Sequence, residues 1–178
     1  DHAYASLSLK QLKIEGSIGF VTEVVYGTLR HYKLLQEQYK PFVKKIKKKM
    51  DVLLVMALYQ HHFMKVPDYA IVNSTVELVK SQEKGFVNAV LRKIFQSEWI
   101  EPMGNNPEDL AIRYSHPEWL IRLWLAQYGL NKTLEILAEN QKPSKVYGRY
   151  NPFLAKKEEL TGFTFYENDC VSYTGNLL

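Results

Sequence analysis

Apolar residues recur at three- and four-residue steps from the start of the chain to about Gln141. This spacing is typical of amphipathic α-helices, which turn one stripe of side chains toward a core. A short first helix is expected to end near Gly16, and Ser17 can cap a second helix. The apolar stripe of the second helix consists of Ile18, Val21, Val25, Leu29 and Tyr32. Gly27 lies inside this stripe, where glycine costs about 1 kcal/mol relative to alanine, so we expect another helix to cross closely there.

The segment from residue 48 to 63 is apolar on nearly every side. A helix of that kind is buried among its neighbours, so we predict that it is the central helix of the fold, preceded by a third, more exposed helix up to Lys45. Pro67 excludes a continuous helix, and Asp68 is expected to cap a helix that runs to Lys80. The inward-facing residues of that helix are predicted to be Ala70, Val72, Val76 and Val79.

The segment from Phe86 to Phe95 has two distinct faces. Helical spacing puts the apolar residues on one side, namely Phe86, Val87, Val90, Leu91, Ile94 and Phe95. It puts the polar residues on the other side, namely Asn88, Arg92, Lys93 and Gln96. We therefore predict a helix that buries one face and exposes a polar, basic one.

Two further helix starts follow a linker at residues 101–106, where the composition changes to Pro, Gly and Asn. Asn106 supplies a cap before Pro107 at the first helical position. Ser115 and Glu118 have the spacing of a capping box. The helix that they start is expected to stop at Gly129, after which another helix runs to the end of this region.

Beyond Pro143 the residues favour strands. The segments 145–151, 163–166 and 171–173 are rich in Val, Tyr and Phe, which suit a pleated sheet. Roughly thirty residues of this kind cannot bury a sheet alone, so we expect the beginning of a longer domain. The whole pattern predicts an all-α fold with a helical domain over residues 1–100 and a helical connector over 101–143, followed by the truncated start of a β-containing domain over 144–178.

Composition narrows the class of protein. The chain of 178 residues is 46% hydrophobic, which excludes disorder as its main state. Its one cysteine, Cys170, excludes an internal disulfide framework and fits a reducing compartment. The longest apolar run, from Val52 to Tyr59, is far shorter than the roughly 20 residues that span a bilayer, and no export signal opens the chain. We therefore expect a cytoplasmic protein with no membrane partner.

Positive charge gathers in the first half of the chain. Residues 1–100 hold 15 Lys and Arg against 9 Asp and Glu, a net +6, whereas residues 101–178 hold 8 against 10, a net −2. A basic face in the first half suits a polyanion such as RNA, although the same charges also suit a surface that is merely well solvated.

Four motifs occur in an order and spacing that resemble a known family. They are VTEVVYGTLRHYKLL (21–35), VPDYAIVNSTVELVK (66–80), KGFVNAVLRKI (84–94) and YSHPEWLIRLWLAQYG (114–129). In series they resemble the amino-terminal region of the bacterial small-subunit ribosomal RNA cytosine-C5 methyltransferases, the Sun/Fmu family, over nearly the whole chain. The first three motifs lie in a part that is similar to the antitermination factor NusB, an all-α RNA-binding fold.

The resemblance implies a NusB-like helical bundle, a connector, a small α/β domain and a methyltransferase domain that binds S-adenosylmethionine and carries catalytic cysteines. Arg149 and Asn151 match the family's Arg-x-Asn strand at the start of the small α/β domain. The catalytic domain is then expected beyond Leu178, so this chain alone is expected to be inactive and to hold no cofactor. The implied partners are small-subunit ribosomal RNA and the missing methyltransferase domain.

The residues themselves give no sign of a cofactor or catalytic site. The glycines are scattered, whereas a nucleoside cofactor is held by a glycine-rich turn between a strand and a helix. Cys170 lies far upstream of the position that the resemblance gives to the catalytic cysteine. His61 and His62 diverge by about 100° on a helix, so no metal site is predicted. Three aromatic residues can stack on RNA bases, but burial against the rest of the protein is the favoured interpretation; they are Trp119, Trp124 and Tyr128.

The candidate RNA contacts are basic and polar residues, because Lys and Arg neutralise phosphates and Asn can contact a sugar or base edge. They are Arg30, His31, Lys33, Lys44, Lys45, Lys47, Lys48, Lys84, Asn88, Arg92 and Lys93, with Arg149 in the strand motif. The residues near position 30 are expected to join those of 84–93 if their two helices pack side by side. The alternatives are a solvated lysine run and intramolecular ion pairs with Glu23 or Glu77.

The resemblance therefore implies that this chain is the RNA-docking region of an S-adenosylmethionine-dependent ribosomal RNA cytosine-C5 methyltransferase. Two other functions stay open. A stand-alone RNA-binding factor of the antitermination type would share the first hundred residues but would not need the connector or the β segment. A protein-interaction module would dock an acidic partner on the basic face.

Overall fold

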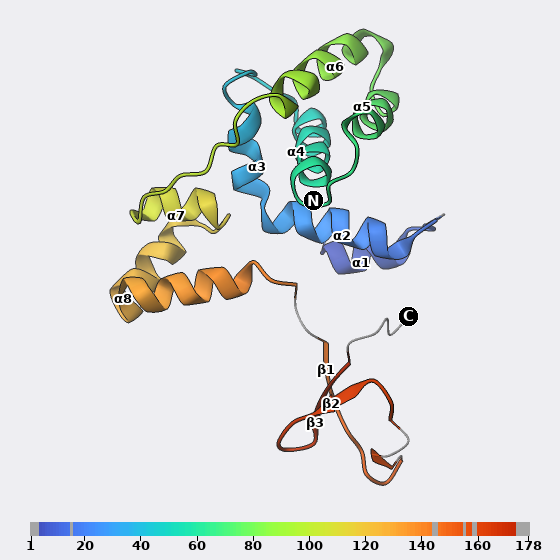
Figure 1. The fold of residues 1–178 in the computed structure, drawn as a ribbon, viewed down its shortest axis with the longest axis vertical. Helices are drawn as coiled ribbons and strands as arrows, with labels where there is room; N and C mark the ends of the chain where they lie inside the picture. The colour runs from blue at the N-terminus through green and yellow to red at the C-terminus, as the bar shows by residue number, and fades with distance from the viewer. Residues whose placement is uncertain (1–3, 15, 144–145, 155, 158–159, 174–178) are drawn as a thin grey trace. The chain divides into compact units, whose positions relative to one another are not determined.

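The computed structural model of the chain describes residues 4–14, 16–143, 146–154, 156–157 and 160–173. The chain forms two compact units, Asp1–Gln141 and Lys142–Leu178. Figure 1 shows helices in the first unit and a small sheet in the second, which confirms the predicted all-α fold with a β-containing C-terminal part. The helices are α1 (Ala5–Gln11), α2 (Ile18–Arg30), α3 (Tyr32–Tyr39), α4 (Lys48–His62), α5 (Asp68–Glu77), α6 (Ser81–Phe95), α7 (Pro107–Arg113) and α8 (Glu118–Asn140). The strands are β1 (Val146–Arg149), β2 (Phe163–Phe165) and β3 (Cys170–Tyr173).

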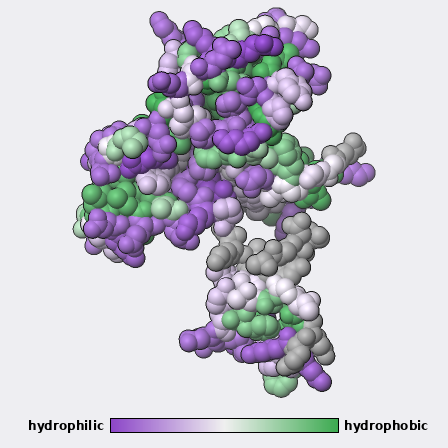
Figure 2. All heavy atoms as spheres, viewed as in Figure 1, coloured by the Kyte–Doolittle hydropathy of each residue, from purple (hydrophilic) through white to green (hydrophobic). Residues whose placement is uncertain are grey.

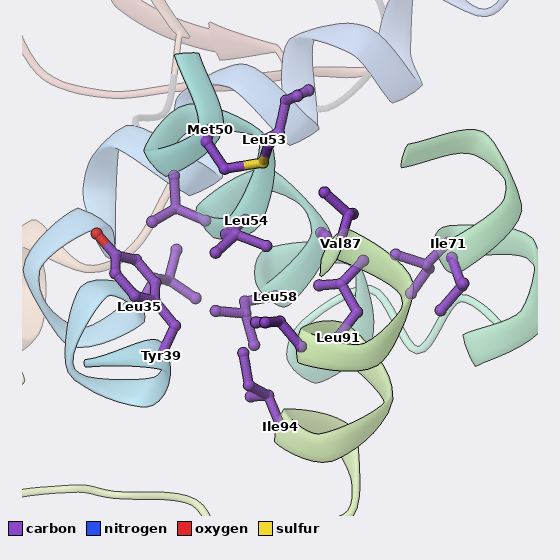
Figure 3. Packing of buried hydrophobic residues seen from close by; sticks show 14 of the residues in the cluster. Leu35, Tyr39, Met50, Leu53, Leu54, Leu58, Ile71, Val87, Leu91 and Ile94 are labelled. Carbon is purple, nitrogen blue, oxygen red and sulfur yellow. The ribbon is translucent and has the colours of Figure 1, made fainter. Parts of the chain in front are cut away.

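Helix α4 is the centre of the first unit, as its apolar pattern predicts. It packs against α2, α3, α5 and α6. Leu54 and Leu58 of α4 are fully buried, and in Figure 3 they lie between Leu35 of α3 and Leu91 of α6. Burying one such leucine stabilises the fold by roughly 1.5–3 kcal/mol, so this layer of leucines supplies much of the drive to assemble the bundle.

The expected close crossing at Gly27 is confirmed. An ideal Cβ atom on Gly27 would lie 1.9 Å from Cζ of Tyr59, which is far too close for two carbon atoms that are not bonded to each other. The Tyr59 hydroxyl donates a hydrogen bond to Glu23 at 2.5 Å, which fixes the ring against α2. The glycine therefore lets α2 and α4 approach closely enough for the tyrosine ring to lie between them.

The predicted apolar stripe of α2 is only partly correct. Ile18 and Leu29 are 51% and 54% exposed, whereas Val24, Gly27 and Thr28 are buried. The close approach at Gly27 determines which face of α2 meets α4. This face differs from the one that carries the large apolar residues Ile18 and Leu29. Ser17 does cap the helix, since its hydroxyl accepts a hydrogen bond from the Phe20 amide at 3.3 Å.

The expectation of a more exposed third helix reaching Lys45 is wrong. Helix α3 ends at Tyr39 and buries Leu34, Leu35, Gln38 and Tyr39. Its polar side chains become buried because they find partners: the Gln38 amide donates to the Ile100 carbonyl at 2.7 Å and accepts from the Ile100 amide at 2.8 Å. The pattern of polar and apolar residues does not reveal partners that lie so far apart in the sequence.

A buried carboxylate joins α3 to α4. Asp51 is 8% exposed and accepts hydrogen bonds from the hydroxyls of Tyr32 and Tyr39 and from the Gln36 amide. Burial and the hydrogen bond to Asp51 raise the pKa of Tyr32 to about 12, with the pKa of Tyr39 raised further for the same reasons. Both phenols therefore stay protonated donors over the physiological range.

Helix α5 also differs from its predicted form. Pro67 occupies the cap position, and Asp68 is the first helical residue, where its carboxylate lies 2.7 Å from Nδ1 of His61 instead of capping the helix. The helix ends at Glu77, and its buried residues are Ile71, Val72 and Thr75. Ala70 and Val76, expected to face inward, are only partly buried.

The region after α6 forms a second layer with a small core of its own, made of Leu110, Ala111, Ile121 and Leu137. The predicted cap is confirmed, because Asn106 accepts a hydrogen bond from the Asp109 amide at 2.8 Å. The predicted break is also confirmed, because Gly129 has a φ of 72° and interrupts α8.

The predicted capping box at Ser115 is wrong. The Ser115 hydroxyl accepts hydrogen bonds from the amides of Lys33 and Leu34 at 3.1 and 3.3 Å, so it caps α3 from more than eighty residues away. Pro117 stands at the cap position of α8. Helix α3 has no side-chain cap from its own N-terminal residue, His31, and the distant serine takes that place.

The second unit contains an antiparallel sheet in the order β1-β3-β2, which confirms the predicted strands. Arg149 of β1 pairs with Cys170 of β3, and Phe165 of β2 pairs with Val171. Within the residues described for the whole chain, no helix has the length and apolar character needed to cross a membrane.

Candidate nucleic-acid interface

Helix α6 separates its two faces as the sequence predicts. Val87, Val90, Leu91 and Ile94 are buried, and Arg92 and Lys93 are exposed. Phe86, expected on the inner face, is 45% exposed. Figure 2 shows hydrophilic residues gathered over this helix on the face in view. The exposed side of α6 therefore offers cations on a rigid element.

Two cations of the polar face have defined contacts. Nε of Arg92 donates a hydrogen bond of 2.9 Å to the Asn88 side-chain oxygen one turn earlier. The Lys93 ammonium lies 5.2 Å from the centre of the Phe42 ring, a cation–π distance. Lys84 lies in the first turn of the same helix and is exposed. Four predicted residues thus share one helix.

A groove between α5 and α6 adds an aromatic residue to this face. Its volume is about 380 Å³, and Arg92, Gln96 and Tyr69 line it together with Asp68, whose carboxylate lies 2.7 Å from Nδ1 of His61. Tyr69 is 72% exposed. A guanidinium next to an exposed ring can hold a phosphate and a stacked base together. The sequence prediction missed Tyr69, although an aromatic residue on the polar side of α5 was a usable signal.

The lysine run lies at the start of α4. Lys44, Lys45, Lys47 and Lys48 are exposed, and they precede or begin the helix. Lys49 donates a hydrogen bond of 3.2 Å to the Leu78 carbonyl, which links this run to the end of α5. Cations are unfavourable at the positive end of a helix dipole, and an anionic partner would relieve that repulsion.

The residues near position 30 do not join those of α6. Among the described residues, α2 packs against α1, α3 and α4, and α6 packs against α3, α4 and α5, so the two helices do not lie side by side as expected. The Lys33 ammonium donates a hydrogen bond of 2.7 Å to the His116 carbonyl, a contact inside the first unit. Arg30 is partly buried.

His31 acts as an aromatic packing residue and not as a cation. Its ring stacks on Phe63 with 4.1 Å between ring centres. Burial, with smaller effects from Arg30 and His62, lowers the pKa of His31 from 6.5 to about 4. The imidazole is therefore neutral at physiological pH.

Arg149 belongs to the second unit and is described within it alone. It is exposed and lines a cavity of about 540 Å³ with Tyr150, Asn151 and Asp169. The matched residues Arg149 and Asn151 thus line the same cavity at the end of β1.

The sequence analysis also singled out the aromatic residues of α8 and the two adjacent histidines. Trp124 packs against the small core of α7 and α8, whereas Trp119 and Tyr128 are 67% and 54% exposed. His62 stacks on Trp99 with 3.7 Å between ring centres. In the part of the chain that the structure describes, no three His, Cys, Asp or Glu side chains gather as a metal site would require.

Comparisons with known proteins show the family of the chain. The model of the NusB family matches residues 3–96. The chain is 36% identical over 177 residues to a probable ribosomal RNA small subunit methyltransferase B of Bacillus subtilis (strain 168). This alignment covers 90% of this chain and 39% of that protein. The chain is 31% identical to the ribosomal RNA small subunit methyltransferase B of Serratia proteamaculans (strain 568), covering 76% of this chain and 33% of that protein. For the protein of the same name from Vibrio cholerae the identity is 31%, with 72% and 31% covered. The chain therefore spans between about a third and two fifths of the length of these relatives.

Proposed function

The chain belongs to the NusB family through residues 3–96, and from this premise we propose that it is the RNA-docking region of a ribosomal RNA methyltransferase. Similarity to proteins of that name continues past residue 96 and covers 90% of the chain. A stand-alone factor of the NusB type would need nothing beyond the bundle, so this continuation favours the methyltransferase. A ribosomal RNA partner fits a cytoplasmic location.

The observation that carries this proposal is the exposed face of α6 with the groove beside it. Arg92 is oriented by Asn88, and Tyr69 lines the same groove as Arg92. Lys84 and Lys93 on the same helix add phosphate contacts that carry no sequence information but fix the position of an RNA. We assign the main RNA contacts to this face.

The lysine run of residues 44–48 and the residues Arg30 and Arg149 are proposed as secondary contacts, which add salt-dependent affinity. His31 and Lys33 are proposed to act less directly, since a neutral, stacked imidazole and an ammonium bonded to the His116 carbonyl are poor phosphate ligands. Their substitution is expected to change RNA affinity through the packing of α3.

The reaction of the parent protein is proposed to be methyl transfer from S-adenosylmethionine to C5 of a cytosine. The described residues do not fit that cofactor: their strands form an antiparallel sheet, and no glycine-rich turn leads from a strand into a helix there. We therefore assign no catalytic step to these residues. Their proposed contribution is to bind and orient the RNA.

The proposal is tested by charge reversal on two sets of three cations. The test variant carries Lys84→Glu, Arg92→Glu and Lys93→Glu, and the matched control carries Lys142→Glu, Lys156→Glu and Lys157→Glu. Binding to a fluorescent small-subunit ribosomal RNA stem-loop is measured by anisotropy at two salt concentrations, with an unrelated RNA for comparison. We expect the test variant to bind at least about tenfold more weakly at low salt and to depend less on salt, because it loses phosphate contacts.

The control is expected to lose less than about threefold, since its cations lie outside the α6 face. Unchanged helical circular dichroism in both variants excludes loss of the fold as the cause. Equal losses in the two variants would overturn the assigned face. An unmodified chain that binds no RNA even at low salt would instead indicate a module that docks an acidic protein.

A further inference from the structure

A second hollow, separate from the α5–α6 groove, lies where α3, the end of α4 and the residues around α7 meet. Its volume is about 180 Å³. The residues that line it come from segments far apart in the sequence, among them His31, Phe63, Trp99, Glu101, Arg113 and Gln141.

Aromatic rings form much of its wall. Phe63 stacks on His31 and meets the Trp99 ring edge-on, with 6.2 Å between ring centres. Trp99 in turn stacks on His62. Phe63 nevertheless remains 37% exposed, so the stack has an accessible part at the hollow. Such rings bind flat, unsaturated groups with little loss of conformational freedom.

Two polar atoms at the hollow are buried without a hydrogen-bond partner among the described residues: Nε of Arg113, a donor, and Oε1 of Gln141, an acceptor. Both side chains are held in place by their other atoms. Arg113 donates to the Pro102 carbonyl at 3.1 Å, and Gln141 donates to the Tyr114 carbonyl at 2.8 Å. Buried polar groups in folded proteins nearly always bond to protein or to water, so this donor and this acceptor are free to bond a polar group that enters the hollow.

We propose that this hollow binds a single unstacked nucleobase of the RNA. Every nucleobase presents a donor beside an acceptor on its pairing edge, which complements Arg113 and Gln141, and a flat face for Phe63 and Trp99. The volume is below the roughly 300–1,000 Å³ of pockets for drug-sized ligands, so it suits one ring system better than a whole nucleotide.

A phosphate is a poorer match for the same residues. The Glu101 carboxylate also lines the hollow and would repel an anion. The lowered pKa of His31 leaves that ring without positive charge at neutral pH. This inference rests on the proposed RNA-docking function and adds a preference for unpaired bases, which the exposed α6 face does not supply.

The test uses the 178-residue chain and two stem-loops that differ only by one bulged 2-aminopurine, with the fully paired stem-loop as reference. Anisotropy measures affinity, and 2-aminopurine emission reports stacking of the base. We expect the bulged RNA to bind about tenfold more tightly, with a change in emission. The preference is expected to fall to about twofold or less in Trp99→Leu and in Gln141→Met, and to persist in the control Trp119→Leu, whose exposed ring lies on α8.

The outcomes separate this inference from the proposed function. Equal, salt-dependent binding of both RNAs would leave RNA docking intact and overturn the base pocket. A preference that survives in both pocket variants, with unchanged circular dichroism, would overturn it as well. If neither RNA binds, titration with free 2-aminopurine riboside decides: quenching that Gln141→Met abolishes supports a nucleobase site, and absence of quenching overturns it.

Discussion

Gly27 sets how closely α2 and α4 approach. A methyl group there would collide with the Tyr59 ring, which is 3% exposed and held by Glu23. His31, four residues later, is held by stacking on Phe63. At the scale of single residues, stability therefore depends on a few aromatic rings around α4.

We expect Gly27→Ala to lower the free energy of unfolding by about 1–3 kcal/mol, because the overpacking outweighs the gain of up to about 1 kcal/mol in helix propensity. Gly19→Ala in the same helix is the matched control, since the nearest atom to its new Cβ is 3.9 Å away. This control is expected to be neutral or stabilising. Urea unfolding followed by circular dichroism measures both, and a Gly27→Ala variant as stable as the parent would contradict the close crossing.

The lowered pKa of His31 makes stability depend on pH. Its folded pKa of about 4 lies below the unfolded value of 6.5, so the unfolded state binds the proton more readily. The stability is complete above pH 6.5 and is lost progressively as the pH falls toward 4. Urea unfolding at pH 7.5 and pH 5 measures this loss. In His31→Phe the loss should shrink markedly, and an equal loss in parent and variant would exclude His31 as its source.

At the scale of elements, α3 is held from both ends by groups distant in sequence. Ser115 caps its start, and Gln38 near its end bonds both backbone groups of Ile100. On its other face Asp51 gathers two tyrosine hydroxyls. The short helix is therefore ordered by tertiary contacts, as expected for a helix too short to be stable in isolation.

Ser115→Ala is expected to lower the free energy of unfolding by about 1–2 kcal/mol, because two amides at the start of α3 lose their acceptor. Ser74→Ala serves as the control: its hydroxyl only bonds carbonyls of its own helix, at 2.9 and 3.1 Å. The control should change stability by less than about 0.5 kcal/mol. Chemical denaturation of both variants measures the difference, and indistinguishable midpoints would argue against the distant cap.

At the scale of the whole first unit, the bundle and the α7–α8 layer are joined through α3. Helix α7 packs on α3, and Lys33 and Ser115 bond across the junction. The layer has its own small core, but the bundle draws part of its order from it. The two layers are consequently expected to be energetically coupled.

A chain of residues 1–100 should have a free energy of unfolding at least about 2 kcal/mol below that of residues 1–141, since the Ser115 and Lys33 bonds are lost. Guanidinium unfolding of both chains, monitored by helical circular dichroism, gives the two values. The chain of residues 1–141 with Ser115→Ala should fall between them. Equal values for the two lengths would show that the bundle is independent of the second layer.

The sequence by itself determined the helices, the central place of α4, the caps at Ser17 and Asn106, the close approach at Gly27, the break at Gly129 and the strands. These features depend on helical or strand spacing and on hydrogen bonds between residues a few positions apart, which the order of residues records directly. The polar face of α6 was predictable for the same reason.

Only the tertiary structure decided which polar groups are used internally. Ser115 fits a capping box by spacing, yet it bonds Lys33 and Leu34, and Lys33 itself bonds the His116 carbonyl. Tyr69 and Arg92 line one groove from two helices, and Trp99, Arg113 and Gln141 line one hollow from three segments. Such partners lie many residues apart, and spacing along the chain carries no signal for them because the packing of whole helices brings them together.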